Sequence, residues 1–237
     1  MKKLSKAMAA VLAGGILLSG IGVSAESTDV QSNSAESVEL ASPEWQSCLD
    51  ELAKYKIFEG DENGDFTPYN NITRAEIAKV LCKVSGLKPD NNGAQAFSDV
   101  DLSHWAYGYV NTAAAANFVE GTENGTFSPD ADVTYDEVVK MLVSVLGYAP
   151  QAEQIGGYPE GYIETASRIG LTNDIIVASD MPCPRYMVFT LMNNALDIPF
   201  MVQSGFNFSE NAGEYSIADG KDGRSLITLR NKITEMK

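Results

Sequence analysis

Apolar side chains recur at helical spacing in three stretches of the chain, 77–84, 138–145 and 188–196. Within each stretch they are three or four residues apart, so they lie on one face of a helix. The positions are Ile77, Val80, Leu81 and Val84, then Val138, Met141, Leu142 and Val145, then Val188, Leu191, Met192 and Leu196. The pattern predicts three amphipathic helices.

Polar residues mark the ends of the first two predicted helices. A threonine followed three residues later by a glutamate is typical of a capping box, in which each side chain bonds the other residue's backbone N–H. These pairs are Thr73 with Glu76 and Thr134 with Glu137. Gly86 and Gly147 follow the helices as C′ residues. The third stretch has Pro184 and Met187 where the other two have threonine and glutamate.

The first two helices belong to an internal repeat, because "GDENGDFTPYNNITRAEIAKVLCKVSG" (60–86) returns as "GTENGTFSPDADVTYDEVVKMLVSVLG" (121–147). Both copies keep the turn residues, which are Gly60, Gly64, Phe66 and Pro68 in the first and Gly121, Gly125, Phe127 and Pro129 in the second. Asp61 and Asp65 become threonines, and the glycine and glutamate of a calcium loop are missing. We therefore interpret the repeat as conserved turn geometry, with no metal site.

Each copy has a further helix before its turn. Trp45 and Trp105 open these segments, which are predicted to run to about Ile57 and Phe118. A degraded third copy has "GYPEGYIETASRIGL" (157–171) as its first helix. One such unit is too small to bury its own core, so the copies must stack on one another.

These residues resemble the S-layer homology (SLH) domain. The likeness rests on "FSDVDLSHWAYGYV" (97–110), the two Gly-x-x-x-Gly-x-Phe-x-Pro turns and the Thr-Arg-Ala-Glu tetrad at 73–76, and it covers about residues 40 to 200. It implies a mainly α fold in which three helix-loop-helix repeats form a pseudo-threefold spindle around a central three-helix bundle. Grooves between the prongs of relatives hold secondary cell-wall polysaccharide of Gram-positive bacteria, commonly pyruvylated. The resemblance thus implies non-covalent anchoring to the cell wall.

The resemblance also implies polysaccharide-binding residues, which are Arg74, Arg185, Trp45, Trp105 and Asp99. An arginine near a helix N-terminus can pair with a ketal carboxylate, and an aromatic face can stack on a sugar ring. The alternatives stay open, because such an arginine can be a surface charge and such a tryptophan a packing anchor. In the second repeat Tyr135 replaces the arginine, and in the third Tyr162 is the nearest match to the tryptophan.

The remaining segments suggest an exported chain. Residues 1–25 have the lysines, apolar run and small-residue end of a signal peptide, and 26–40 are a polar, acidic leader. The repeats are predicted at 41–92, 93–148 and 149–200. In the extension, 201–237, the sequence allows a short β-hairpin around Asp219 to Gly223, and the extension is expected to cover the third repeat.

The composition of the chain excludes several classes of partner and of functional site. The net charge of −15 argues against nucleic acid and anionic lipid as partners, and no membrane insertion is expected after signal cleavage. We found no catalytic constellation, cofactor motif or metal-ligand spacing, and we interpret Cys48, Cys82 and Cys183 as small apolar side chains. Two hypotheses remain: a cell-surface protein anchored by wall polysaccharide, and a structural or protein-interaction subunit of the envelope whose repeats no longer bind polymer.

Overall fold

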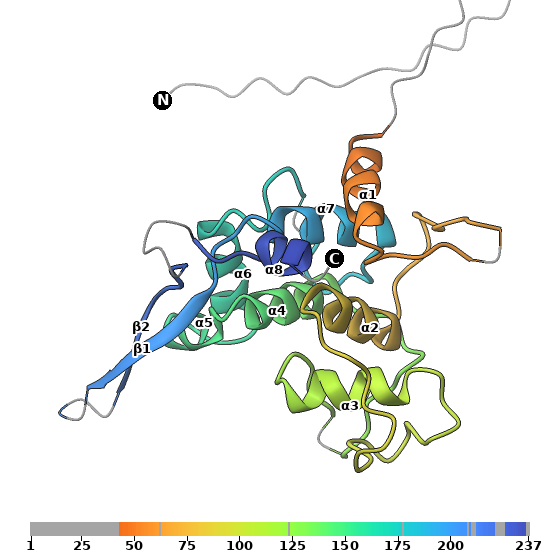
Figure 1. The fold of residues 1–237 in the computed structure, drawn as a ribbon, viewed down its shortest axis with the longest axis horizontal. Helices are drawn as coiled ribbons and strands as arrows, with labels where there is room; N and C mark the ends of the chain where they lie inside the picture. The colour runs from red at the N-terminus through yellow and green to blue at the C-terminus, as the bar shows by residue number, and fades with distance from the viewer. Residues whose placement is uncertain are drawn as a thin grey trace, which may run out of the picture. The chain divides into compact units, whose positions relative to one another are not determined.

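The computed structural model describes residues 43–235, except 62, 123, 177, 208, 210, 211 and 221–225. The predicted signal peptide and leader lie outside this range. The described residues belong to one compact unit and form helices α1 to α8 and strands β1 and β2 (Figure 1). In chain order these are α1 Glu44–Lys54, α2 Arg74–Val84, α3 Tyr107–Ala115, α4 Tyr135–Val145, α5 Ala149–Gln154, α6 Glu160–Arg168, α7 Arg185–Ala195, β1 Met201–Asn207, β2 Ala212–Ile217 and α8 Leu229–Glu235.

The three helices predicted from apolar spacing are α2, α4 and α7. Both capping boxes are present: Thr73 accepts from the N–H of Glu76 and Thr134 from that of Glu137, and each glutamate accepts from its threonine's N–H. Pro184 caps α7 without a side-chain bond. The predicted helix starts are therefore confirmed.

A ring of backbone bridges joins the starts of these helices. Single antiparallel bridges pair Thr73 with Asp132, Thr134 with Pro182, and Asn71 with Pro184. The first repeat thus contacts the second, the second the third, and the third returns to the first. α4 also packs against both α2 and α7. This cyclic order is that of a pseudo-threefold bundle, as expected for a mainly α fold.

The first helix of each repeat packs on the second helix of the preceding repeat. α3 packs against α2, α6 against α4, and α1 against α7 (Figure 1). No repeat therefore completes its own helix pair among the described residues. The repeats therefore stack by packing the first helix of each one on its neighbour, in a cyclic order.

The first helices end earlier than predicted, at Lys54 and Ala115, and α3 begins only at Tyr107. Lys56 (φ 54°) and Asn117 (φ 56°) take the left-handed conformation, which stops a helix. Trp105 consequently lies in the turn before α3, whereas Trp45 is within α1. The apolar pattern predicted helices that are too long, because Ile57 and Phe118 pack into the core from the loops that follow α1 and α3.

The repeated turns have the predicted geometry. Gly64 (φ 80°) and Gly125 (φ 74°) occupy the left-handed region. Phe127 is fully buried and Phe66 partly so. The Asp61 carboxylate accepts the N–H groups of its own turn, from Asn63 and Asp65, and within the described residues no cluster of metal-ligating side chains is present.

The C-terminal hairpin lies earlier than predicted. β1 and β2 pair antiparallel from Met201 with Ile217 to Asn207 with Ala212, with a bulge near Gln203 and Gly205. At the predicted hairpin, Asp219 forms a single bridge with Leu226, and 221–225 lie outside the described residues. Both strands are largely exposed, so no inward-facing apolar pattern marked them.

Other expectations concern cysteines and membranes. Cys82 and Cys183 are buried, which raises the pKa of each thiol to about 12, and Cys48 is half-buried; all three are free thiols. Among the residues described, no helix has the length and apolar character needed to span a bilayer.

Candidate functional site

Arg74 joins the first repeat to the second. From the start of α2, its Nε donates to the carbonyl of Phe127 (2.7 Å), Nη2 to the carbonyl of Glu120 (2.8 Å) and Nη1 to the Glu137 carboxylate (2.8 Å). The guanidinium also lies 4.8 Å from the centre of the Phe127 ring. Only 9% of Arg74 is exposed, so its first role is to hold two repeats together.

Arg185 makes the same connection between the third repeat and the first. Its Nε donates to the carbonyl of Phe66 (2.9 Å), and Nη1 pairs with the Glu76 carboxylate (2.9 Å). Glu76 and Glu137 thus serve both the capping boxes and the inter-repeat ion pairs. The two arginines predicted to bind ligand are equivalent, but neither is a solvated surface charge.

The third junction lacks this ion pair. Tyr135 replaces the arginine and Met187 the glutamate, and both side chains are buried. Burial raises the pKa of Tyr135 to about 12, and its hydroxyl has no hydrogen-bond partner among the described residues. Buried, uncharged side chains stand there in place of the ion pair.

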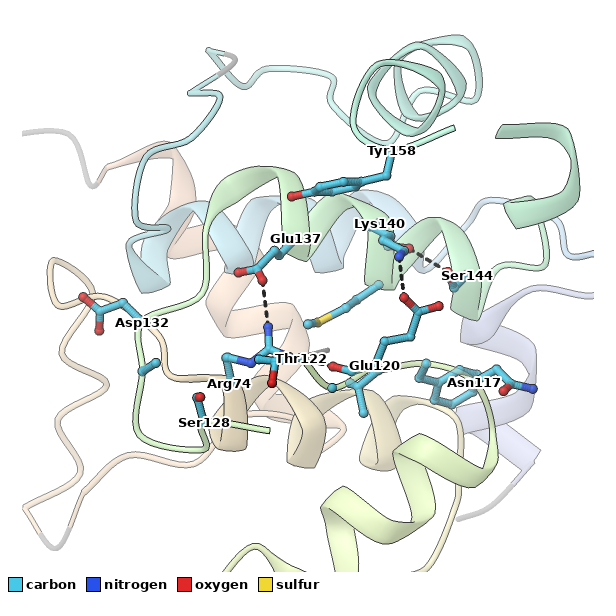
Figure 2. Close-up of a pocket in the computed structure, with 15 residues that line it drawn as sticks. Arg74, Asn117, Glu120, Thr122, Ser128, Asp132, Glu137, Lys140, Ser144 and Tyr158 are labelled. Carbon is cyan, nitrogen blue, oxygen red and sulfur yellow. Dashed lines mark hydrogen bonds and ion pairs between the residues drawn. The ribbon is translucent and has the colours of Figure 1, made fainter. Parts of the chain in front are cut away.

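A cavity of about 430 Å³ lies beside Arg74 (Figure 2). Lys140, from α4, places its ammonium 2.7 Å from the Glu120 carboxylate and 5.3 Å from the centre of the Tyr158 ring. Glu137 and the edge of Arg74 face the same space. We call Arg74, Glu120, Glu137, Lys140 and Tyr158 the first cluster.

A second cluster repeats this arrangement: Arg185, Glu59, Glu76, Lys79 and Trp105. The Lys79 ammonium is 2.9 Å from the Glu59 carboxylate and 5.9 Å from the centre of the Trp105 ring, which is 55% exposed. Lys83 also pairs with Glu59, at 2.7 Å. Hydrogen bonds from Lys83 and then Lys79 lower the pKa of Glu59 to about 2.

Tyr158 occupies the place in the third repeat that Trp105 occupies in the second. Each stands two residues before its helix, and each ring lies beside the lysine of the preceding repeat. Tyr162, the residue matched from sequence, is 3% exposed and donates its hydroxyl to Glu153. The Tyr162 ring also lies 5.7 Å from the Lys140 ammonium, so both tyrosines flank this lysine, and Tyr158 is the more exposed of the two.

Trp45 and Asp99 have structural roles. The Trp45 ring packs against Phe189 and Tyr69, with centroids 6.2 and 6.1 Å away, and anchors α1 on α7. Asp99 accepts the N–H groups of Phe127 and Ser128, each at 2.7 Å. Although burial acts in the opposite direction, these bonds bring the pKa of Asp99 below its usual range.

Sequence reasoning missed the two lysines and their glutamates. Lys79 and Lys140 occupy equivalent positions in the repeat, as do Glu59 and Glu120. Comparing charged positions between the copies would have found them, whereas the motif search stopped at the tetrad. Chemically, each cluster offers an ammonium group beside an aromatic ring, which suits an acidic sugar.

The comparison with protein families agrees with the geometry. The model of the S-layer homology domain matches residues 49–78 and 96–139. These segments contain most of the first two repeats, and the third repeat lies outside them.

Among the relatives, the middle cell wall protein of Brevibacillus brevis is 31% identical over 179 residues, 74% of this chain and 16% of its own length. The surface layer protein of Brevibacillus choshinensis is 33% identical over 147 residues, 61% of this chain and 13% of its own. The cellulosome-anchoring protein of Acetivibrio thermocellus is 32% identical over 123 residues, 46% of this chain and 28% of its own.

The chain thus spans between 13% and 28% of the length of these relatives. Their names and the matched domain assign it to the cell wall or cell surface, which confirms the expected location. Proteins named as enzymes share the repeats as well.

Proposed function

We propose that this chain, which carries S-layer homology domains at 49–78 and 96–139, is a non-catalytic anchor that binds secondary cell-wall polysaccharide. The observation that carries the proposal is the recurrence of one constellation, a glutamate-paired lysine beside an aromatic ring, at two of the three repeat junctions. The repeats could have kept their fold without these surface residues. Their presence at both junctions supports a shared ligand.

The lysines are the groups that would meet an anionic sugar. Glu120 is 73% exposed and Glu59 53%, so their pairs with Lys140 and Lys79 are worth at most about 1 kcal/mol. A ketal carboxylate can therefore replace either glutamate at small cost. Arg74 and Arg185 are only 11% exposed in their side chains and already bonded within the chain. They fix the walls of the site.

The aromatic rings would complete recognition. Tyr158 lies above Lys140 at the cavity beside Arg74, where a sugar ring can stack on it while a carboxylate reaches the ammonium (Figure 2). A volume of about 430 Å³ is within the range of carbohydrate and other small-ligand sites. Pyruvylation of the polymer would supply the carboxylate.

A second candidate is a structural or protein-interaction subunit of the envelope. The third junction favours it, since Tyr135, Met187 and Thr190 stand where the other junctions have arginine, glutamate and lysine. Loss of one site out of three is expected if polymer binding is no longer selected. The two candidates differ in whether purified wall polymer is bound.

Sedimentation with peptidoglycan sacculi, before and after acid removal of their secondary polymer, tests the proposal. The wild type should pellet only with polymer-bearing sacculi. Lys140→Ala and Lys79→Ala should each weaken binding about tenfold while leaving the fold intact. Lys88→Ala, an exposed lysine outside both clusters, is the matched control. If the wild type stays in solution with polymer-bearing sacculi from a suitable host, the anchor function is wrong and a protein partner should be sought.

A further inference from the structure

The two lysine clusters differ in charge, although they occupy equivalent places in the repeat. Ser144 stands in α4 where Lys83 stands in α2, and Asp132 precedes α4 where Asn71 precedes α2. Ser144 and Asp132 both line the cavity of the first cluster (Figure 2). One position has lost a cation and the other has gained an anion, so the first junction is more negative by two charges.

The total charge of each junction follows from these two positions. The second has three cations and two carboxylates, a net charge of +1: Lys79, Lys83 and Arg185 with Glu59 and Glu76. The first has two cations and three carboxylates, a net charge of −1: Arg74 and Lys140 with Glu120, Asp132 and Glu137. Asp130, which pairs with His104 beside Trp105, is matched by Asp180 at the same distance before the third helix, so this position does not distinguish the junctions.

Lys83 also changes what happens when a ligand arrives. Its ammonium is 2.7 Å from Glu59 Oε1, whereas the Lys79 ammonium is 2.9 Å from Oε2. Lys83 donates to the carbonyl of Lys56 as well, at 3.2 Å, and its side chain is 21% exposed. If Lys79 turns to a carboxylate of the ligand, Glu59 therefore keeps a paired cation.

The first cluster has no such reserve. Lys140 is the one cation paired with Glu120 within the described part of the chain. A ligand carboxylate that takes Lys140 leaves Glu120 unpaired, and the two carboxylates then repel each other. What the first cluster does offer is a cavity beside the Tyr158 ring, which can hold a sugar by its C–H surface whatever its charge.

We propose that Lys83 makes the second cluster selective for polymer units that carry a carboxylate, whereas the first cluster binds sugar units with little regard to their charge. This inference rests on the proposed function, since it concerns the same polymer at the same two clusters. Lys83 is a positioning residue here, because it touches Glu59 and leaves Lys79 free for the ligand.

Binding to two forms of the polymer tests the proposal. The secondary polymer extracted from sacculi is immobilised either as isolated or after carbodiimide activation and borohydride reduction, which turn its carboxylates into alcohols. Lys140→Ala isolates the second cluster and should bind the native polymer about tenfold more tightly than the reduced one. Lys79→Ala isolates the first cluster and should differ by less than about threefold between the two polymers.

Substitutions at position 83 then test the residue itself, in the Lys140→Ala background. Lys83→Ser, which copies the first junction, should weaken binding to native polymer about fivefold and leave binding to reduced polymer unchanged. Lys83→Arg keeps the charge and should retain the preference for native polymer. Lys88→Ala, outside both clusters, is the control in the same background.

The reverse exchange is made at the first junction, in the Lys79→Ala background. Ser144→Lys should raise the preference for native over reduced polymer about threefold, because Glu120 then has a second cation on α4.

The outcomes separate this inference from the proposed function. Wild type that binds neither polymer refutes the anchor function, and the inference with it. Wild type that binds native polymer, with equal preferences in Lys140→Ala and Lys79→Ala, refutes the inference alone. Equal weakening by Lys83→Ser on both polymers does the same, since Lys83 then supports only the fold of the site.

Discussion

At the repeat junctions the arginines have structural contacts, whereas the lysines are the residues that we propose to bind the polymer. Arg74 and Arg185 are buried against backbone carbonyls, and Lys79 and Lys140 are held by exposed glutamates. Both residue types are cationic, so their sequence positions alone do not separate the roles. Burial separates them, because a buried guanidinium bonded on several sides cannot turn to a ligand without loss of stability.

Replacing Arg74 should therefore affect stability more than replacing Lys140. Arg74→Ala should lower the free energy of unfolding by about 2 to 4 kcal/mol, because it removes the donor to Glu137 Oε1 and to the carbonyls of Phe127 and Glu120. Lys140→Ala should change it by less than about 0.5 kcal/mol. Urea unfolding followed by circular dichroism measures both. Equal stabilities of the two variants would contradict this division.

The pKa of Glu59 predicts a loss of stability in acid. Its folded value of about 2 lies below the ordinary 4.5, so the unfolded chain binds more protons between these values. The contribution is fully present above pH 4.5 and is lost as the pH falls toward 2. Since the side chain is 53% exposed, the effect should stay below about 1 kcal/mol.

Glu59→Gln should flatten this dependence. The difference in unfolding free energy between wild type and variant should shrink between about pH 5 and about pH 3. Urea unfolding at several pH values measures it. A difference that grows as the pH falls would show that the sign of the shift is wrong.

At the scale of elements, two glycines with similar φ differ in their surroundings. A Cβ on Gly64 would meet nothing within 4 Å, whereas one on Gly147 would lie 2.1 Å from the carbonyl oxygen of Met201. Glycine is therefore favoured at position 64 only by the left-handed conformation of the turn. Gly147 ends α4 and also lets the chain entering β1 pass closely.

Gly147→Ala should consequently destabilise more than Gly64→Ala. The left-handed conformation costs an alanine about 1 to 2 kcal/mol, which is all that Gly64→Ala should lose. Gly147→Ala adds a clash with backbone and should lose about 3 kcal/mol or more. Thermal unfolding of both variants compares them, and a smaller loss in Gly147→Ala would mean that β1 moves freely.

At the scale of the whole molecule, α8 joins the two ends of the described chain. Arg230 donates through Nε and Nη2 to both oxygens of Asp197, after α7, and through Nη1 to Glu51 of α1. The hydrogen bonds that Arg230 donates to the Asp197 carboxylate are the main reason that the pKa of Arg230 is raised. The N–H of Arg230 also donates to the carbonyl of Leu196, so the extension contacts the third repeat here.

Arg230→Ala should therefore weaken the closed ring as a whole. We expect the free energy of unfolding to fall by about 1 to 2 kcal/mol. Unfolding should remain a single cooperative transition, because each packed helix pair combines helices from different repeats. Arg168→Ala, which breaks an exposed pair within α6, should lose less than about 0.5 kcal/mol. Calorimetry of both variants measures this, and separate transitions for the repeats would contradict the exchanged helix pairs.

The sequence by itself determined the local features: the apolar faces of α2, α4 and α7, the two capping boxes, the glycine turns and the family likeness. These depend on residues within a few positions of one another, so they can be recognised without knowing the fold. The sequence also showed that Pro184 lacks a capping side chain and that Tyr135 stands at the position of the arginine in the other repeats.

The tertiary structure decided everything that depends on neighbours distant in the chain. It paired α3 with α2 and α1 with α7, and it buried Arg74 and Arg185 between repeats. It also placed Tyr158 beside Lys140, together with Tyr162. It also buried Asp136 Oδ1 without a hydrogen-bond partner among the described residues. Such outcomes follow from which repeat packs beside which, because burial and hydrogen-bond partners are set by that packing and not by local sequence.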